Sequence, residues 1–289
     1  MSYLRSVVTV LALSLVAAPR AAQERWTVTA EEHAARAPEY EAVAGMARSN
    51  SVWIEELTWV EIADKMEAGV NTVIVSTGGI EQNGPFVALG KHNYVLETAC
   101  EEIARAMGNA LCAPIIKLVP EGGYDPPTGH MRKPGTISLR QETFEAVLDD
   151  VATSLMVHGF DHIILIGDSG GNQSGMAAVA DRVNTRWGKS IAHHIPEYYD
   201  NQGVAAHMES EFGITEDSDG FHDSYWLTAM QMTTDPSTVR YEERVAAGSA
   251  DINGVPISPL AETLAVGWDL MQWRVDSTIE AIHKALSGM

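Results

Sequence analysis

Short apolar runs alternate with amphipathic stretches along this chain, and that alternation limits the possible folds more than any other feature. Residues 162–166 (HIILI) form the most strand-like run, and the β-branched run at residues 73–75 leads into Ser-Thr-Gly-Gly. Residues 111–119 predict a third strand and residues 190–195 a fourth. Continuously apolar runs of this length are typical of strands that are buried on both faces.

Helical patterns lie between these runs. A capping box at residues 58–61 (TWVE) opens a short helix, and apolar side chains recur at helical spacing over residues 95–106. Ser138 is expected to cap an amphipathic helix that ends at Gly159, and another helix is expected over residues 174–187. A β-α-β-α order predicts a three-layer α/β/α fold with a mostly parallel central sheet.

The N-terminus has the three-part layout of a secretory signal peptide. One positive charge precedes an apolar run at residues 7–18, and the small-residue stretch AAPRAA follows it. The run is too short to span a membrane comfortably. We expect residues 1–22 to be removed on export, with Ala18 and Ala22 as the alternative cleavage points, and the protein to be periplasmic or secreted. A short N-terminal membrane anchor is the alternative.

The rest of the chain predicts one domain. Residues 23–50 are rich in Ala and Glu and are expected to form an N-terminal arm. Residues 51–289 contain no composition break and end in a helical third. The two cysteines, Cys100 and Cys112, fall in a helical and a strand pattern, so we predict two free buried thiols; a disulfide between them is the alternative, because an exported protein meets oxidising conditions.

The charge balance excludes two classes of partner. The chain has 39 acidic residues against 19 Lys and Arg, a formal net charge of −20. Such a surface repels both nucleic-acid phosphates and anionic lipid headgroups. We therefore expect a small-molecule substrate and neither a nucleic acid nor a membrane as partner.

Polar segments follow the predicted strands, at the sheet edge where parallel α/β folds bind their ligands. These segments are residues 78–93, 120–136 and 167–173, and a fourth at residues 219–226 precedes the C-terminal helices. The carboxylates and imidazoles they supply are Glu81, His92, Glu121, Asp125, His130, Asp168, His222 and Asp223. Side chains of these types, gathered at one edge, suit a zinc or manganese ion.

The same segments resemble the creatininase (creatinine amidohydrolase) family. The family pattern runs Glu-x-His-Gly-Pro, then His-x-x-Phe-Pro-Gly-Thr, then His-Gly-Gly-Asn, then His-Ala-Gly. This chain shows, in the same order, EQNGP at residues 81–85, HMRKPGT at 130–136, DSGGN at 168–172 and HDS at 222–224. The resemblance implies an α/β/α metal-dependent hydrolase of cyclic amides and related C–N bonds, commonly a homohexamer.

Most ligand positions that the resemblance implies are altered in this chain. Glu81 is retained, but Asn83 and His92 stand where the family has His and Asp. Ser169, which follows Asp168, stands where the family has another His. We therefore expect one zinc or manganese ion per chain, held by Glu81, His92 and Asp168, instead of a dinuclear centre. Three protein ligands and a water are the usual layout of a catalytic zinc.

Further roles are expected around the ion. His222 matches the family histidine placed near the substrate, and we assign proton transfer to His222 or Asp223, with His130 as a third catalytic candidate. The positions expected to bind substrate are Glu121, Asp125, Asn172 and Trp226.

The sequence thus predicts an exported metal-dependent hydrolase of a small cyclic amide, lactam or related C–N or ester bond. Two alternatives stay open: a binding or assembly protein without hydrolytic activity, and a metal-dependent lyase or isomerase. Residues 167–171 also satisfy the Gly-x-Ser-x-Gly serine motif, but the sequence identifies no His–acid pair for Ser169. Trp268 and Trp273 in the C-terminal helices, together with the resemblance, predict a homo-oligomer, a hexamer first of all.

Overall fold

The computed structural model describes residues 39, 42–43, 46–218 and 220–288. Within it, Met46–Met289 forms one compact unit. The expected signal peptide at residues 1–22 lies outside the described residues, as does most of the expected arm. In the described part of the chain, no helix is long and apolar enough to cross a membrane.

A parallel four-stranded sheet lies at the centre of this unit, with strand order β2-β1-β3-β4. Its strands are β1 (Thr72–Thr77), β2 (Ala110–Cys112), β3 (His162–Gly167) and β4 (Ala192–His194). β1 and β3 pair along their whole length, from Thr72 opposite His162 to Thr77 opposite Gly167. Both strands are buried on their two faces, which explains why their sequences are apolar without alternation. The predicted third strand is shorter than expected, because its pairing with β1 ends at Cys112.

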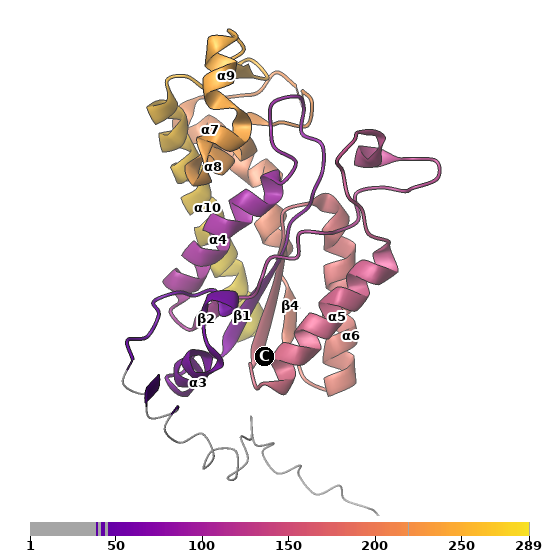
Figure 1. The fold of residues 1–289 in the computed structure, drawn as a ribbon, viewed down its shortest axis with the longest axis vertical. Coiled ribbons are helices and arrows are strands. Elements are labelled where there is room, and N and C mark those ends of the chain that lie inside the picture. The colour runs from indigo at the N-terminus through magenta and orange to yellow at the C-terminus, as the bar shows by residue number, and fades with distance from the viewer. Residues whose placement is uncertain (1–38, 40–41, 44–45, 219, 289) are drawn as a thin grey trace, which may run out of the picture. The chain divides into compact units, whose positions relative to one another are not determined.

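Helices cover both faces of the sheet (Figure 1). α5 (Gln141–Val157) and α6 (Gln173–Trp187) pack against each other on one face. α4 (Lys91–Met107) covers the other face, and α10 (Leu260–Ser287) and α8 (Tyr225–Thr234) pack on α4 and on each other. The predicted three-layer α/β/α architecture is confirmed.

Of the two predicted N-caps, the one at Thr58 is present and the one at Ser138 is not. α3 (Trp59–Glu67) has the predicted capping box: the Thr58 hydroxyl accepts from the backbone N–H of Glu61, whose carboxylate accepts from the backbone N–H of Thr58. The prediction for α5 was wrong, since Arg140 occupies the N-cap position. The Ser138 side chain is instead engaged with the loop that follows β2.

Several small elements complete the unit. α7 (Asn201–Phe212) was not predicted, because its polar sequence shows little amphipathic periodicity; the Asp200 side chain caps it by accepting from Gly203 N. The other elements are α9 (Tyr241–Ala246), the antiparallel pair β5 (Asp251–Ile252) and β6 (Val255–Pro256), and the 3₁₀ turns η1 (Ile54–Glu56), η2 (Gly129–Arg132), η3 (Gly170–Asn172), η4 (Pro196–Tyr199) and η5 (Pro236–Val239).

Cys100 and Cys112 form a disulfide, so the prediction of two free thiols was wrong. Cys100 lies on the buried face of α4, and Cys112 is the last residue of β2. α4 packs directly on β2, which brings the two Cα atoms to 6.2 Å, within the range that a disulfide spans. The helical and strand patterns were right, but their packing is not visible in the sequence.

Removing this crosslink is expected to destabilise the unit. The two cysteines are 12 positions apart, and a crosslink over a loop of this size restricts the unfolded chain by about 3 kcal/mol. We expect the double variant Cys100→Ala/Cys112→Ala to lose free energy of unfolding of about that size in urea denaturation. The wild-type protein treated with a reductant is the matched control and should move in the same direction. Unchanged midpoints in both samples would show that the disulfide carries no stability.

Candidate active site

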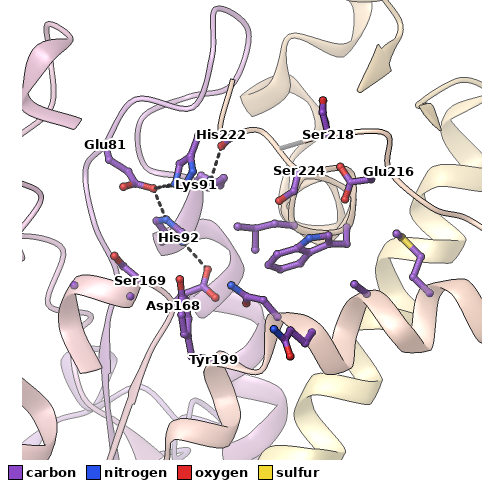
Figure 2. Close-up of a pocket in the computed structure, with 18 of the residues that line it drawn as sticks. Glu81, Lys91, His92, Asp168, Ser169, Tyr199, Glu216, Ser218, His222 and Ser224 are labelled. Atoms are coloured by element: carbon purple, nitrogen blue, oxygen red, sulfur yellow. Dashed lines mark hydrogen bonds and ion pairs between the residues drawn. The ribbon is translucent and has the colours of Figure 1, made fainter. Parts of the chain in front are cut away.

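One open cavity of about 1020 Å³ lies beyond the carboxyl ends of the strands. The loop after β1 supplies Glu81, and the first turn of α4 supplies Lys91 and His92. Asp168 follows β3 directly. Figure 2 shows these four side chains gathered on one side of the cavity, with α7 and the start of α8 forming the opposite wall. The cavity therefore stands where a parallel sheet is expected to bind its ligand.

Glu81 is the buried centre of the site. Its Oε1 atom lies 2.6 Å from His92 Nε2 and 3.0 Å from His222 Nε2 (Figure 2). Its Oε2 atom lies 3.1 Å from His130 Nε2. Burial alone raises the pKa of Glu81, but the hydrogen bonds from His222 and His92 and the charges of His92 and Lys91 outweigh it and hold the pKa well below its usual value. Glu81 is therefore an anion that three imidazoles contact.

His92 connects Glu81 to Asp168. Its Nδ1 atom lies 2.8 Å from Asp168 Oδ2, while its Nε2 atom faces Glu81. Because both partners are carboxylates, both contacts are hydrogen bonds only when each ring nitrogen carries a proton. Burial and Lys91 lower the pKa of His92, but the hydrogen bonds to Asp168 and Glu81 outweigh them, so the net shift is upward.

Asp168 is held in turn from the C-terminal helix. Arg274 on α10 donates from Nη1 to Asp168 Oδ1 at 2.7 Å, and both side chains are 1% exposed. The Arg274 guanidinium also lies over the rings of Tyr198 and Trp226, at 5.1 and 5.3 Å from their centroids. Each Asp168 oxygen thus has a protein donor, and this carboxylate fixes the orientation of His92.

Lys91 is a buried cation that the sequence analysis missed. Its side chain is 2% exposed, and its Nζ atom donates to the His222 carbonyl oxygen at 2.9 Å and lies 3.9 Å from Glu81 Oε1. Burial lowers the pKa of Lys91 although four carboxylates nearby oppose the shift. The sequence feature that could have identified Lys91 is its place beside His92 in the first turn of α4, but a lysine at such a position is more often a surface residue.

Glu121 reaches the site from the loop after β2. The Ser138 hydroxyl anchors this loop: it accepts from Glu121 N at 2.9 Å and donates to the Gly122 carbonyl oxygen at 2.8 Å. The glutamate side chain passes over Gly79, where a Cβ atom would collide with Glu121 Oε1. Among the described residues, this buried Oε1 atom has no hydrogen-bond partner. Burial, and then the negative charge of Glu81, raise the pKa of Glu121 to about 9.

Within the described part of the chain, two groups of three side chains offer ligand atoms to a metal ion, and both contain Glu81. One is Glu81, His92 and His222, the other is Glu81, Glu121 and His130, and the ligand atoms within each lie within 4.8 Å of one another. Their imidazole and carboxylate donors, with the unpartnered oxygen of Glu121, fit a zinc or manganese ion.

The predicted ligand set is only partly assembled by the structure. Glu81 and His92 lie together, as expected, but Asp168 belongs to neither group. It contacts the opposite ring nitrogen of His92, so the imidazole stands between Asp168 and Glu81. His222 takes the place expected of Asp168, because the loop before α8 folds back over Glu81.

The other predicted site residues divide into two sets. His130, His222 and Trp226 line the cavity, with the two imidazole centroids 4.6 Å apart. The remaining three, Asp223, Asp125 and Asn172, lie outside that lining. Asp223 is buried and accepts from the backbone N–H of Phe221, Asp125 is exposed, and Asn172 is buried with its side-chain nitrogen donating to carbonyl oxygens at the end of β1.

The fold and the site define a class, and comparison with known proteins agrees with it. The family model Creatininase, described as creatinine amidohydrolase, matches residues 55–278. This chain therefore belongs to the creatininase family.

Two curated proteins are similar to part of the chain. A creatinine amidohydrolase of Pseudomonas putida is 28% identical over 121 residues, which is 41% of this chain and 45% of that protein. A 3-dehydro-scyllo-inosose hydrolase of Thermotoga maritima is 26% identical over 125 residues, which is 43% of this chain and 38% of that protein. The matches thus span less than half the length of these relatives.

Solved structures share the fold over a longer stretch. A creatininase with a tryptophan-to-alanine mutation has a TM-score of 0.63 at 19% identity, covering 81% of this chain and 98% of that one. A mutant creatininase described as Zn-Zn type has a TM-score of 0.60 at 19% identity, covering 82% and 98%. A structure named Creatininase Mn has a TM-score of 0.59 at 19% identity, with the same coverage.

Proposed function

We propose that this chain is a metal-dependent hydrolase of a small cyclic amide, lactam or related C–N or ester bond. The observation that carries the proposal is Glu81, a buried carboxylate that closes one side of an open cavity and belongs to two groups of metal-ligand side chains. Family membership supports it, as do the names of the two relatives, which are hydrolases of creatinine and of 3-dehydro-scyllo-inosose.

We propose one zinc or manganese ion per chain, bound through Glu81. The similar solved structures, one described as a Zn-Zn type creatininase and one named Creatininase Mn, support these two metals. Asn83 argues for a single ion, because it stands where the family has a histidine and an amide is a poorer zinc ligand than an imidazole. When bound, the ion lowers the pKa of a water molecule and polarises the substrate carbonyl.

The chain's own groups supply proton transfer. His222 has the most open of the three imidazoles around Glu81, with its side chain 48% exposed against 27% for His130 and 5% for His92. We assign to His222 Nε2, which is hydrogen bonded to Glu81, the delivery of a proton to the leaving group. Its backbone φ of 73° is a left-handed conformation, which is uncommon for a residue other than glycine, and Lys91 donates a hydrogen bond to its carbonyl oxygen.

Asp223 then has a different role from the one predicted for it. It is buried outside the cavity lining and accepts from the backbone N–H of Phe221. The carboxylate thereby fixes the turn that presents His222. Trp226 and Tyr199 form part of the cavity wall and are positioned to contact a ring substrate.

The test of this function uses metal-depleted and metal-reconstituted protein on a panel of lactams, cyclic amides, lactones and amides in H₂¹⁸O. We expect turnover that disappears on chelation, returns with about one equivalent of zinc or manganese, and places ¹⁸O in the product. Turnover without ¹⁸O would replace the hydrolase by a lyase or isomerase. Specific ligand binding without turnover in the metal-loaded protein would support the binding protein instead.

The role of His222 has its own expected result. Replacing His222 by Ala should lower kcat by about a hundredfold or more, because general acid catalysis contributes on that order. His158→Ala is the matched control, since His158 is exposed at the end of α5, far from the cavity lining. Steady-state kinetics on the best substrate measures both variants. Equal kcat values for wild type and His222→Ala would remove His222 from the mechanism.

We also propose that the protein is exported and assembles with itself. The disulfide between Cys100 and Cys112 supports an oxidising compartment. Trp268, 47% exposed on α10, supports a contact surface for a homo-oligomer, with a hexamer as the leading arrangement.

Removal of residues 1–22, or of residues 1–18, is the expected outcome of export. The change is measured by intact-mass analysis of protein taken from the periplasm or the medium. A soluble cytosolic protein that retains its N-terminal 18 residues would contradict export. The oxidised disulfide in the same sample, read from a two-proton mass difference after reduction, is the internal control.

A further inference from the structure

The two groups that share Glu81 are unequal, and the difference shows which of them accepts a metal ion. His92 and His222 contact Oε1 of Glu81, whereas His130, the imidazole of the group that contains Glu121, contacts Oε2. The first is rich in protein donors and positive charge. The second holds a second carboxylate and little to balance it.

The Oε1 side of Glu81 is already satisfied. A carboxylate oxygen accepts through about two lone pairs, and His92 Nε2 at 2.6 Å and His222 Nε2 at 3.0 Å occupy them. His92 is not free to turn, because Asp168 holds its other nitrogen. The Lys91 Nζ atom lies 3.9 Å from Oε1, and the four carboxylates around it favour its ammonium form. A divalent ion on this side would meet that ammonium in a buried place, where like charges repel more strongly than in water.

The Oε2 side is left with an excess of acceptors. Glu121 is 5% exposed, and its Oε1 atom has no partner among the described residues. His130 lines the open cavity on this side, and its Nε2 atom lies 3.1 Å from Glu81 Oε2. A buried carboxylate oxygen without a donor is costly, and a cation that binds both carboxylates removes the cost.

We propose that one divalent cation binds Glu81 Oε2, the Glu121 carboxylate and His130 Nε2, and that the Lys91 ammonium is a fixed cation serving the Oε1 side in place of a second ion. This inference rests on the proposed function and deepens it by locating the ion and giving the reason for its being single. It also turns Glu121 from a predicted substrate contact into a ligand, and His92 from a predicted ligand into a hydrogen-bond donor.

The charges support this arrangement. With the ion bound, the carboxylates of Glu81 and Glu121 contribute two negative charges, while the ion, Lys91 and the doubly protonated His92 contribute four positive ones. This excess of positive charge suits the negative charge that develops on the carbonyl oxygen of a substrate during hydrolysis. A second divalent ion beside Lys91 would raise the excess from two charges to four at the same buried place. Asp168 does not change this count, because Arg274 pairs with it.

The first arm of the test compares two substitutions on opposite sides of Glu81. Zinc is titrated calorimetrically into metal-depleted wild type, Glu121→Gln and His222→Gln at one pH. Mutating a residue that hydrogen bonds to a metal ligand weakens metal binding by about 10- to 100-fold. Glu121→Gln changes a ligand itself, so it should raise the Kd for zinc by about a hundredfold or more. His222→Gln should stay within about threefold of wild type. The reverse order would place the ion at Oε1 and overturn the assignment.

The second arm counts ions. Elemental analysis after saturation with zinc and gel filtration should find about one ion per chain in wild type and in Lys91→Arg, which keeps the charge. Lys91→Met has a similar shape without the charge, so a second ion should now displace the protons that His92 and His222 share with Glu81 and bind on the Oε1 side. One ion in Lys91→Met would overturn the role of Lys91, while no ion in wild type would overturn the metal-dependent function itself. The Glu121 and His222 comparison stands even where the Lys91 variant fails to fold.

Discussion

Replacing Glu81 by glutamine is expected to remove both the bound metal and the hydrolytic activity. Glu81 is the member that both ligand groups share, and it is the anion that three imidazoles and Lys91 contact. Glutamine keeps the shape but loses the charge. We expect kcat/KM to fall by about a hundredfold to a thousandfold, the size of effect seen when a transition-state electrostatic contact is lost.

The matched control is Glu97→Gln. Glu97 lies on α4 like Lys91 and His92, but its side chain is 41% exposed and pairs with Lys117 at the surface. This variant should retain wild-type turnover and metal content. Kinetics and elemental analysis on the same preparations measure both variants, and circular dichroism confirms that each is folded. Wild-type turnover in Glu81→Gln would contradict the site.

Replacing Arg274 by methionine is expected to cause the largest loss of stability in the protein. The change removes the cation paired with Asp168 at 2.7 Å, where both side chains are 1% exposed. Breaking one partner of a buried ion pair costs about 3–5 kcal/mol. In Arg274→Met the buried Asp168 carboxylate would keep only its contact with His92. Urea denaturation of Arg274→Met should show a loss of that size, and turnover should fall because Asp168 orients His92.

Two further variants separate the ion pair from simple packing. Arg274→Met/Asp168→Asn removes both charges and should recover part of the stability, whereas a packing defect at Arg274 would remain. Arg182→Met breaks the exposed pair with Asp149 and should cost less than about 1 kcal/mol. A loss in Arg274→Met no larger than in Arg182→Met would show that the buried pair does not hold the C-terminal helix to the site.

The parts of the fold that were predictable are those set by local chemistry. β3 follows from an uninterrupted apolar run, and α3 begins at Thr58 because that residue and Glu61 satisfy each other's backbone groups. The disulfide was missed because Cys100 and Cys112 meet only through the packing of α4 on β2. α7 was missed because its helix is specified by a cap and by its neighbours more than by periodicity.

The site shows the same division. Glu81, His92, His130 and His222 were found because motif order and strand ends place them at one edge. Arg274 was not found, since it lies 106 positions from Asp168 in sequence and meets it only when α10 packs beside the sheet.

Two residues that were predicted for the site because they follow the end of a strand do not line the cavity. Asn172 follows β3 as expected, yet its amide donates to carbonyl oxygens at the end of β1 in place of facing the cavity. Asp125 lies in the loop after β2, but that loop turns it outward to solvent. Proximity to a strand end predicts the neighbourhood of a residue, while the loop conformation decides where its side chain points.

The most direct test of a metal centre built on Glu81 is anomalous diffraction from crystals of the zinc-loaded protein, recorded on both sides of the zinc absorption edge. The arrangement described here predicts one strong anomalous peak per chain beside Glu81, between the Glu121 carboxylate and His130. Zinc-saturated crystals with no peak in contact with Glu81 would contradict it.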